Sequence, residues 1–292
     1  MDINYNIMML VCEDDKGMKS SFFHDIYGLL NKNNQIPINI VYYSKHYYGN
    51  LNIKIEKDTY TATKIPKIIF NYSNVKKSLT NLYNTFYVKG MQNILYYGGH
   101  STPLFKDAKY GLKTNIFENI HDIELIILDS CYTSYTNLLS TIIGKTNFVM
   151  ACSTSSPNLG FLSDTFIDIL NNTKMNNIEK YKTLINMFIY RNSSKDKKFK
   201  NIIYRTDASL IDMNKYIDIH KYIQNNNIKK NYKCKIENTP YYCYYDLLCL
   251  IDDNDIKNKI KECVIYTKMN QLAKVFFKKK NIILSGIIIG IK

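Results

Sequence analysis

Two short apolar runs that lead into reactive side chains constrain the fold of this 292-residue chain more than any other feature. The first run covers residues 94–99 and leads into His100, and the second covers residues 123–130 and leads into Cys131. Short, nearly continuous apolar runs of this kind are typical of strands that are buried on both faces of a parallel sheet. The sequence therefore predicts two parallel strands, each followed by a side chain that can take part in chemistry.

The spacing of these two side chains predicts a site. The 31 positions from His100 to Cys131 can hold the helical crossover that parallel strands require. If the two strands are neighbours, both side chains emerge at the carboxyl edge of the sheet, where open α/β sheets place their sites. A thiol beside an imidazole is a nucleophile and its base, and the imidazole lowers the pKa of the thiol by forming an ion pair with it.

Backbone groups around the pair fit the same chemistry. The N–H of Cys131 and the N–H of Ser101, directly after the histidine, are candidate donors to an oxyanion. Gly99 would let the chain turn tightly and admit the backbone of a substrate. Cys152 also follows an apolar run, and we interpret it as a packing residue.

The rest of the chain alternates between apolar runs and amphipathic segments, which predicts a three-layer α/β sandwich with a mostly parallel sheet and helices on both faces. We expect a core over residues 1–206 and a continuation over residues 207–292 that packs on it and adds late strands. The predicted strands cover residues 7–12, 36–43, 148–152, 208–212, 263–266 and 282–291, with a hairpin over 47–64; the predicted helices cover residues 20–30, 73–87, 132–143, 163–170, 180–190 and 213–223.

The net charge of +14 would attract nucleic acid or anionic surfaces non-specifically. The basic runs are short, however, and no RNA-binding or helix-turn-helix signature surrounds them. The Asn, Lys, Ile and Tyr bias is also what an AT-rich genome produces. We therefore interpret the lysines as solvated faces and expect no specific nucleic-acid partner, with a basic nucleic-acid binder as the weakest alternative.

The cysteines and the chain ends bear on the cellular compartment. Seven cysteines, none in a Cys-x-x-Cys spacing, predict reduced thiols in an intracellular protein. The first residues lack the pattern of a signal peptide, and the last apolar run, residues 282–291, has about half the length that spans a bilayer. We expect a cytoplasmic monomer without a transmembrane segment.

The order of these features resembles the clostripain-like cysteine peptidases of the caspase-like clan, over most of the chain. The strand-then-His and strand-then-Asp-x-Cys layout is the most specific part. Weaker similarities lie, in the family's order, at residues 10–15, 148–170, 209–215, 245–247 and 284–289.

The resemblance implies a cysteine endopeptidase that acts on protein or peptide substrates. His100 would be the general base and acid, Cys131 the nucleophile, and Asp129 the base of the S1 pocket, where a carboxylate pairs with an Arg or Lys at P1. Two departures stand out: Ser101 replaces the glycine that the family usually has after the histidine, and residues 152–155 lack the family's acidic side chains. The alternative is a catalytically inactive scaffold or interaction protein with the same fold.

The resemblance also raises metal use and autocleavage. Calcium dependence occurs in the family, but the sequence has no Asp-rich loop of the EF-hand type. We expect no cofactor and no metal-ligating residues, with calcium left open. The basic loops near Lys174 and Lys195 are candidate autocleavage sites for a Lys-directed enzyme.

Overall fold

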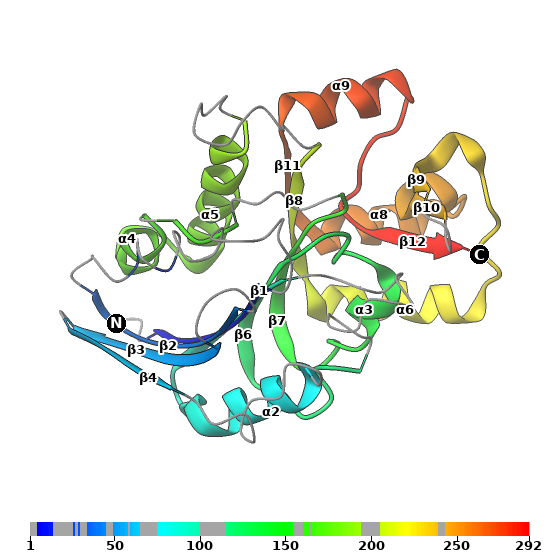
Figure 1. The fold of residues 1–292 in the computed structure, drawn as a ribbon. Helices are drawn as coiled ribbons and strands as arrows, with labels where there is room; N and C mark the ends of the chain where they lie inside the picture. Colours follow the sequence, from blue (N-terminus) through cyan, green and yellow to red (C-terminus); the bar gives the residue numbers. More distant parts are fainter. Residues whose placement is uncertain are drawn as a thin grey trace.

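The computed structural model describes residues 5–13, 26, 29, 34–44, 49–57, 59–64, 75–99, 115–154, 160–163, 165–193, 205–238 and 243–291. Within these ranges, nine strands form one large sheet and three form a small one (Figure 1).

The large sheet has the strand order β11-β8-β7-β6-β5-β1-β2-β3-β4. The central strands β2, β1, β5, β6 and β7 run parallel, whereas β3 and β4 at one edge and β8 and β11 at the other are antiparallel to their neighbours. The strands are β1 (Tyr5–Glu13), β2 (Asn34–Ser44), β3 (Gly49–Lys57), β4 (Thr59–Lys64), β5 (Gln92–Gly98), β6 (Ile123–Asp129), β7 (Thr146–Ala151), β8 (Asp207–Asp212) and β11 (Val264–Met269).

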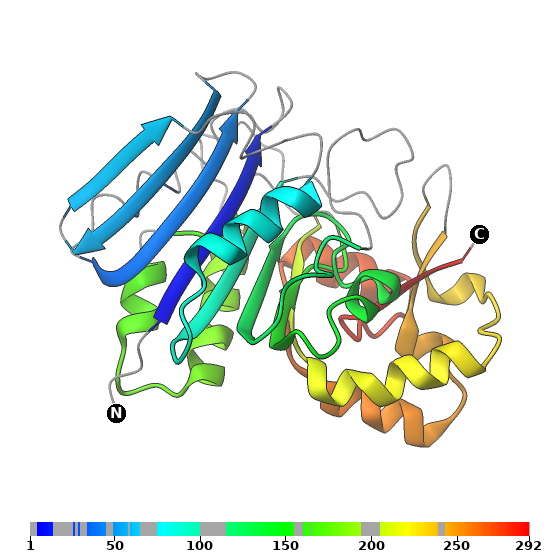
Figure 2. The same ribbon diagram turned by 90° about the horizontal axis from the view of Figure 1, so that it is seen from below.

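Helices cover both faces of this sheet, as Figures 1 and 2 show from two directions. Helices α4 (Phe166–Asn171) and α5 (Asn177–Arg191) lie on one face, and α2 (Val75–Phe86), α3 (Thr136–Ser140), α6 (Met213–Asn225) and α8 (Asn254–Cys263) lie toward the other. The alternation of side chains in β6 explains the two layers, since Leu125 and Ile127 pack with α4 and α5 while Ile126 and Leu128 pack with α2 and α6. The predicted three-layer α/β sandwich is therefore confirmed.

Local capping signals fix several helix starts. Asn176 and Glu179 form a reciprocal capping box at the beginning of α5, and Asp212 accepts hydrogen bonds from two N–H groups at the beginning of α6. Asn270 caps α9 (Gln271–Lys279) through the N–H of Ala273.

Within the described residues, no helix combines the length and the apolar character that crossing a bilayer requires.

The small sheet has the order β12-β10-β9 and is antiparallel. It consists of β9 (Lys235–Asn238), β10 (Cys243–Asp246) and β12 (Ile288–Ile291), with the 3-10 helix η1 (Tyr232–Cys234) before β9 and α7 (Leu247–Leu250) after β10. In Figure 1 it lies beside α3 and α6, on the side away from β3 and β4.

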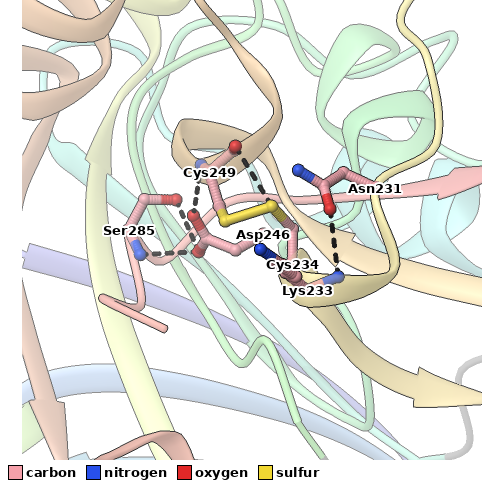
Figure 3. The surroundings of a disulfide bond; sticks show 6 residues. All are labelled: Asn231, Lys233, Cys234, Asp246, Cys249 and Ser285. Atoms are coloured by element: carbon pink, nitrogen blue, oxygen red, sulfur yellow. Dashed lines mark hydrogen bonds between the residues drawn. A yellow bond between two sulfur atoms is a disulfide. The ribbon is translucent and has the colours of Figure 1, made fainter. Parts of the chain in front are cut away.

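A disulfide between Cys234 and Cys249 ties η1 to α7 (Figure 3). Beside it, the buried Asp246 accepts hydrogen bonds from the N–H of Cys249, at 3.3 Å, and from the N–H and hydroxyl of Ser285, at 2.6 and 2.9 Å. The prediction that all seven cysteines are reduced is wrong for these two, because the fold brings together residues that are 15 positions apart.

Two predicted elements are shorter in the structure. The expected helix over residues 132–143 is helical only in α3, and the expected strand over 282–291 is extended only in β12. Most of the expected helix over 20–30 lies outside the described residues. The division at residue 206 stays a prediction; β8 and β11, from beyond it, complete one edge of the large sheet.

Candidate active site

The candidate site lies at the carboxyl edge of the central parallel strands. From β1 the chain adds β2 on one side and, after β3 and β4, returns to add β5, β6 and β7 on the other, so the strand order reverses between β1 and β5. Open α/β sheets bind ligands outside the carboxyl ends of the strands at such a reversal.

Strands β5 and β6 end side by side at this edge. Gly98 pairs with Asp129 in the parallel register, and the N–H of Gly99 donates to the carbonyl of Asp129 at 3.2 Å. Residue 99 must be small, because a Cβ there would lie 3.2 Å from the carbonyl oxygen of Cys12 and 2.9 Å from the hydroxyl of Tyr97.

The predicted site residues are placed only in part. Gly99, Asp129 and Cys131 belong to the described residues, whereas His100 and Ser101 lie outside them. Gly99, which directly precedes His100, is thus hydrogen-bonded to Asp129, which lies two positions before Cys131. Of the crossover between β5 and β6, residues 115–119 form a turn, and residues 100–114 lie outside the description.

Cys131 is the partly exposed thiol at this edge. Cys12, Cys152 and Cys263 are buried by comparison, and the buried position of Cys152 supports its interpretation as a packing residue. Tyr132, directly after Cys131, has φ +54°, in the left-handed region that a residue with a side chain rarely adopts. Such backbone strain costs on the order of 1–3 kcal/mol and tends to occur at functional sites.

The turn after Cys131 is held against the end of β7 by hydrogen bonds. The N–H of Tyr132 donates to the carbonyl of Thr154 at 3.0 Å, and the N–H of Ser134 donates to the carbonyl of Cys152 at 3.0 Å. In return, the N–H of Cys152 donates to the hydroxyl of Thr133 at 3.1 Å. These contacts explain why the helix starts only at Thr136: the preceding residues bond to a neighbouring segment instead of to the next helical turn.

The small sheet supports the same turn through Tyr244, which the sequence analysis did not single out. Its ring stacks on the ring of Tyr132, with centroids 5.1 Å apart and an interplanar angle of 5°, and meets Tyr135 edge-on at 6.1 Å. Gly290 of β12 allows this close approach, since a Cβ there would lie 3.0 Å from the ring of Tyr135. Only the tertiary structure indicates this role.

Asp129 is buried at the end of β6, with 2 % of its surface exposed. Its Oδ2 accepts a hydrogen bond from the hydroxyl of Tyr96, at 2.5 Å, and one from the N–H of Phe161, at 2.8 Å. Residue 160 has to be glycine, because a Cβ would lie 1.9 Å from this oxygen. The carboxylate is therefore fixed in position at the same sheet edge as Cys131.

Asp207 is a second buried carboxylate at this edge, and the sequence analysis missed it. Because β8 is antiparallel to β7, the first residue of β8 lies beside the last residues of β7. Burial raises the pKa of Asp207, while hydrogen bonds from Thr154 and Ser153 act in the opposite direction. Its signal in the sequence was an aspartate directly before the apolar run that predicted a strand over 208–212.

Metal ligands do not gather in the part of the chain that the structure describes: no group of three or more His, Cys, Asp or Glu side chains there could hold an ion. The site consists instead of a thiol on a strained turn, a fixed carboxylate and the end of β5. This arrangement can present a nucleophile to a substrate that lies across the sheet edge.

The sequence matches no protein-family model and no curated protein. The structure, in contrast, is similar to solved structures along nearly its whole length. A secreted C11 cysteine protease from Bacteroides thetaiotaomicron, "iotapain", superposes with a TM-score of 0.73 at 13 % identity, covering 99 % of this chain and 94 % of that one. The chain has the fold of the C11 cysteine proteases.

Two further structures with the C11 fold agree. An inactive zymogen of a C11 protease from Parabacteroides distasonis gives a TM-score of 0.72 at 12 % identity, covering 100 % of this chain and 93 % of that one. A secreted C11 cysteine protease from Bacteroides thetaiotaomicron with an irreversible peptide inhibitor gives 0.66 at 10 % identity, covering 92 % and 85 %. The structural resemblance to clostripain-like, caspase-like proteins is thereby confirmed.

Proposed function

We propose that this chain is a cysteine endopeptidase in which Cys131 is the nucleophile and His100 the general base and acid. The observation that carries the proposal is the partly exposed Cys131 thiol at the end of β6, followed by a residue in the left-handed conformation. The hydrogen bond from Gly99 to Asp129 supports a position for His100 at the same sheet edge. The C11 fold agrees with this chemistry.

In the proposed reaction, the imidazole of His100 accepts the thiol proton as the sulfur attacks the carbonyl carbon of the scissile bond. A C–S bond forms, and the N–H groups of Cys131 and Ser101 donate to the developing oxyanion. The tetrahedral intermediate collapses, the C–N bond breaks, and His100 returns the proton to the leaving amine. Water, deprotonated by the same imidazole, then attacks the thioester carbon, the C–S bond breaks, and His100 returns the proton to the sulfur.

We infer a preference for Arg or Lys at P1. The support is the Asp129 carboxylate, which the hydroxyl of Tyr96 and the N–H of Phe161 hold at this edge of the sheet. A basic side chain donates a charge-assisted hydrogen bond to a carboxylate that is held in position. Gly99 and Ser101 would contact the substrate backbone beside the cysteine.

The nucleophile is tested with peptides that carry Arg or Lys at P1 and with a basic chloromethyl ketone. Cys131→Ala should abolish both hydrolysis and covalent labelling. Cys243→Ala is the matched control, because Cys243 is also a partly exposed thiol, in the small sheet. Turnover by Cys131→Ala at the rate of an active wild type would refute the assignment.

The specificity is tested with matched substrates that have arginine or its neutral isostere citrulline at P1. Asp129→Asn should lower kcat/KM for the arginine substrate by roughly 10- to 100-fold, the value of a hydrogen bond to a charged group. The citrulline substrate should be affected much less. An unchanged ratio between the two substrates would contradict the role of Asp129.

One of the structures with the C11 fold is described as an inactive zymogen, so the assay should include protein nicked by limited proteolysis. Self-cleavage near Lys174 or Lys195 stays a prediction, tested by comparing the fragments of wild type and Cys131→Ala. A folded protein that reacts with no thiol-directed peptide probe, intact or nicked, would favour the alternative of an inactive scaffold.

The other sequence-based expectations remain proposals: a monomer, no specific nucleic-acid partner, and activity without a cofactor, with calcium open. The cytoplasmic location was also expected from the sequence. The Cys234–Cys249 disulfide favours an oxidising compartment, since such bonds form and persist there.

A further inference from the structure

We propose that Asp207 is a positioning residue for Cys131, acting through the backbone of Thr154 and Tyr132. The inference rests on the proposed function, because it concerns the geometry of the same nucleophile. Asp207 does not touch the proposed reacting atoms; it fixes the segment against which the nucleophile turn is built.

The first step is the set of hydrogen bonds that the Asp207 side chain accepts from the segment after β7. Its carboxylate is completely buried and accepts hydrogen bonds from the N–H of Ser153, at 3.0 Å, the N–H of Thr154, at 2.9 Å, and the hydroxyl of Thr154, at 2.7 Å. The Thr154 hydroxyl also lies 2.8 Å from the carbonyl of Arg205, two residues before β8 begins. One carboxylate thus orients two consecutive backbone amides and thereby fixes the position of this segment.

The second step leads from this segment to the nucleophile. With its N–H bound to Asp207, Thr154 presents its carbonyl to the N–H of Tyr132 at 3.0 Å. That hydrogen bond holds Tyr132 at φ +54°, the conformation that sets the direction in which the chain leaves Cys131. A hydrogen bond between the hydroxyls of Ser134 and Ser153, 2.9 Å apart, ties the same two segments together.

The chemistry of the carboxylate explains why an aspartate is needed here. The N–H groups of Ser153 and Thr154 can only donate, and they reach Oδ2 and Oδ1 respectively, so the position requires acceptor oxygens on both branches of the side chain. An asparagine would place its NH₂ group opposite one of these two N–H donors. The expected consequence is a displaced Thr154 carbonyl and a Tyr132 that leaves its strained conformation.

The test compares Asp207→Asn with Asp212→Asn. Asp212 lies at the opposite end of β8, where its side chain accepts hydrogen bonds from the N–H groups of Asn214 and Lys215, far from the sheet edge of Cys131. Asp207→Asn should lower kcat roughly 10- to 100-fold, with KM changed by no more than about twofold, because the cost of a misplaced nucleophile appears in the chemical step. Asp212→Asn should leave kcat near that of wild type, since asparagine caps a helix about as well as aspartate.

Thr154→Val provides a second variant if Asp207→Asn folds poorly, since it removes one hydroxyl donor and keeps the backbone amide. Its kcat should fall by a smaller factor with the same unchanged KM. Loss of kcat in Asp212→Asn equal to that in Asp207→Asn and Thr154→Val, or a loss confined to KM, would overturn the inference.

Hydrogen exchange at the Tyr132 amide separates this inference from the proposed function. Asp207→Asn should accelerate exchange at Tyr132, and Asp212→Asn should not, whether or not the protein hydrolyses peptides. An inactive wild type with that pattern would refute only the peptidase assignment. Unchanged exchange at Tyr132 in Asp207→Asn would refute the positioning role, even in an active enzyme.

Discussion

Removing the Cys234–Cys249 disulfide should destabilise the protein by an amount that follows from its position in the chain. The two cysteines are separated by 15 positions, and a cross-link that closes a loop of this length lowers the entropy of the unfolded chain by an equivalent of about 3 kcal/mol at 25 °C. Since 1 kcal/mol shifts the melting temperature of a large domain by roughly 2–4 °C, the expected loss is about 6–12 °C. The length of this chain favours the lower end of that range.

The assay is thermal unfolding of protein produced in an oxidising compartment, with and without a reductant. The double variant Cys234→Ala/Cys249→Ala should melt at the temperature of the reduced wild type and should not respond to the reductant. Cys243→Ala is the control, since Cys243 lies in the same small sheet but outside the disulfide. It should keep the full response to the reductant.

Alkylation provides an independent count of the thiols. N-ethylmaleimide should modify five cysteines in the unfolded, unreduced protein and all seven after reduction. Seven adducts without a reductant would refute the disulfide. Five adducts together with an unchanged melting temperature on reduction would refute the entropy argument and leave the bond in place.

Three further predictions concern stability. Burial raises the pKa of Asp246 to about 7, so the folded state binds this proton more tightly than the unfolded chain does. As the pH rises from about 4 to 7, the free energy of unfolding should therefore fall by on the order of 1 kcal/mol per pH unit. Asp246→Asn should flatten that slope in urea titrations, and an equal slope in both proteins would contradict the assignment. Gly286→Ala should lower the free energy of unfolding by about 1–3 kcal/mol, because φ is +92° and a Cβ would lie 2.2 Å from the hydroxyl of Ser209. Gly90→Ala, with φ +86° and open space around the Cβ, should lower it less, and equal losses would show that the clash with Ser209 contributes nothing. Phe188→Ala should cost about 3–5 kcal/mol in the same titrations, because the ring is buried between α5 and the sheet; a loss below about 1 kcal/mol would indicate a loosely packed layer.

Helices and strands with strong local patterns were predicted closely. The spacing of apolar residues over 73–87 and 180–190 indicated α2 and α5, and the run over 208–212 indicated β8 followed by α6. Helices α8 and α9 and the detailed course of residues 282–287 were missed. This last segment is irregular because it is held from outside, by Asp246 at Ser285 and by the tight approach of Gly286 to β8.

The helix expected over residues 132–143 shows how tertiary contacts override a local pattern. Its apolar spacing is genuine, and α3 occupies the centre of the range. The first residues instead form the turn that binds the end of β7, and the N–H of Ile288 donates to the carbonyl of Ser134. Competing hydrogen bonds to two distant segments therefore decide where the helix begins.

The sequence by itself determined the elements whose cause is local: buried strands from continuous apolar runs, helices from periodic ones, and a cysteine two residues after an aspartate at the end of a strand. The tertiary structure alone decided which distant residues meet: Cys234 with Cys249, Tyr244 with Tyr132, and Asp207 with the segment after β7. The physical reason is that periodicity reports the environment of each residue, whereas partners are set by strand order and direction. Asp207 reaches the site only because β8 runs antiparallel to β7, and no local pattern in the sequence specifies that direction.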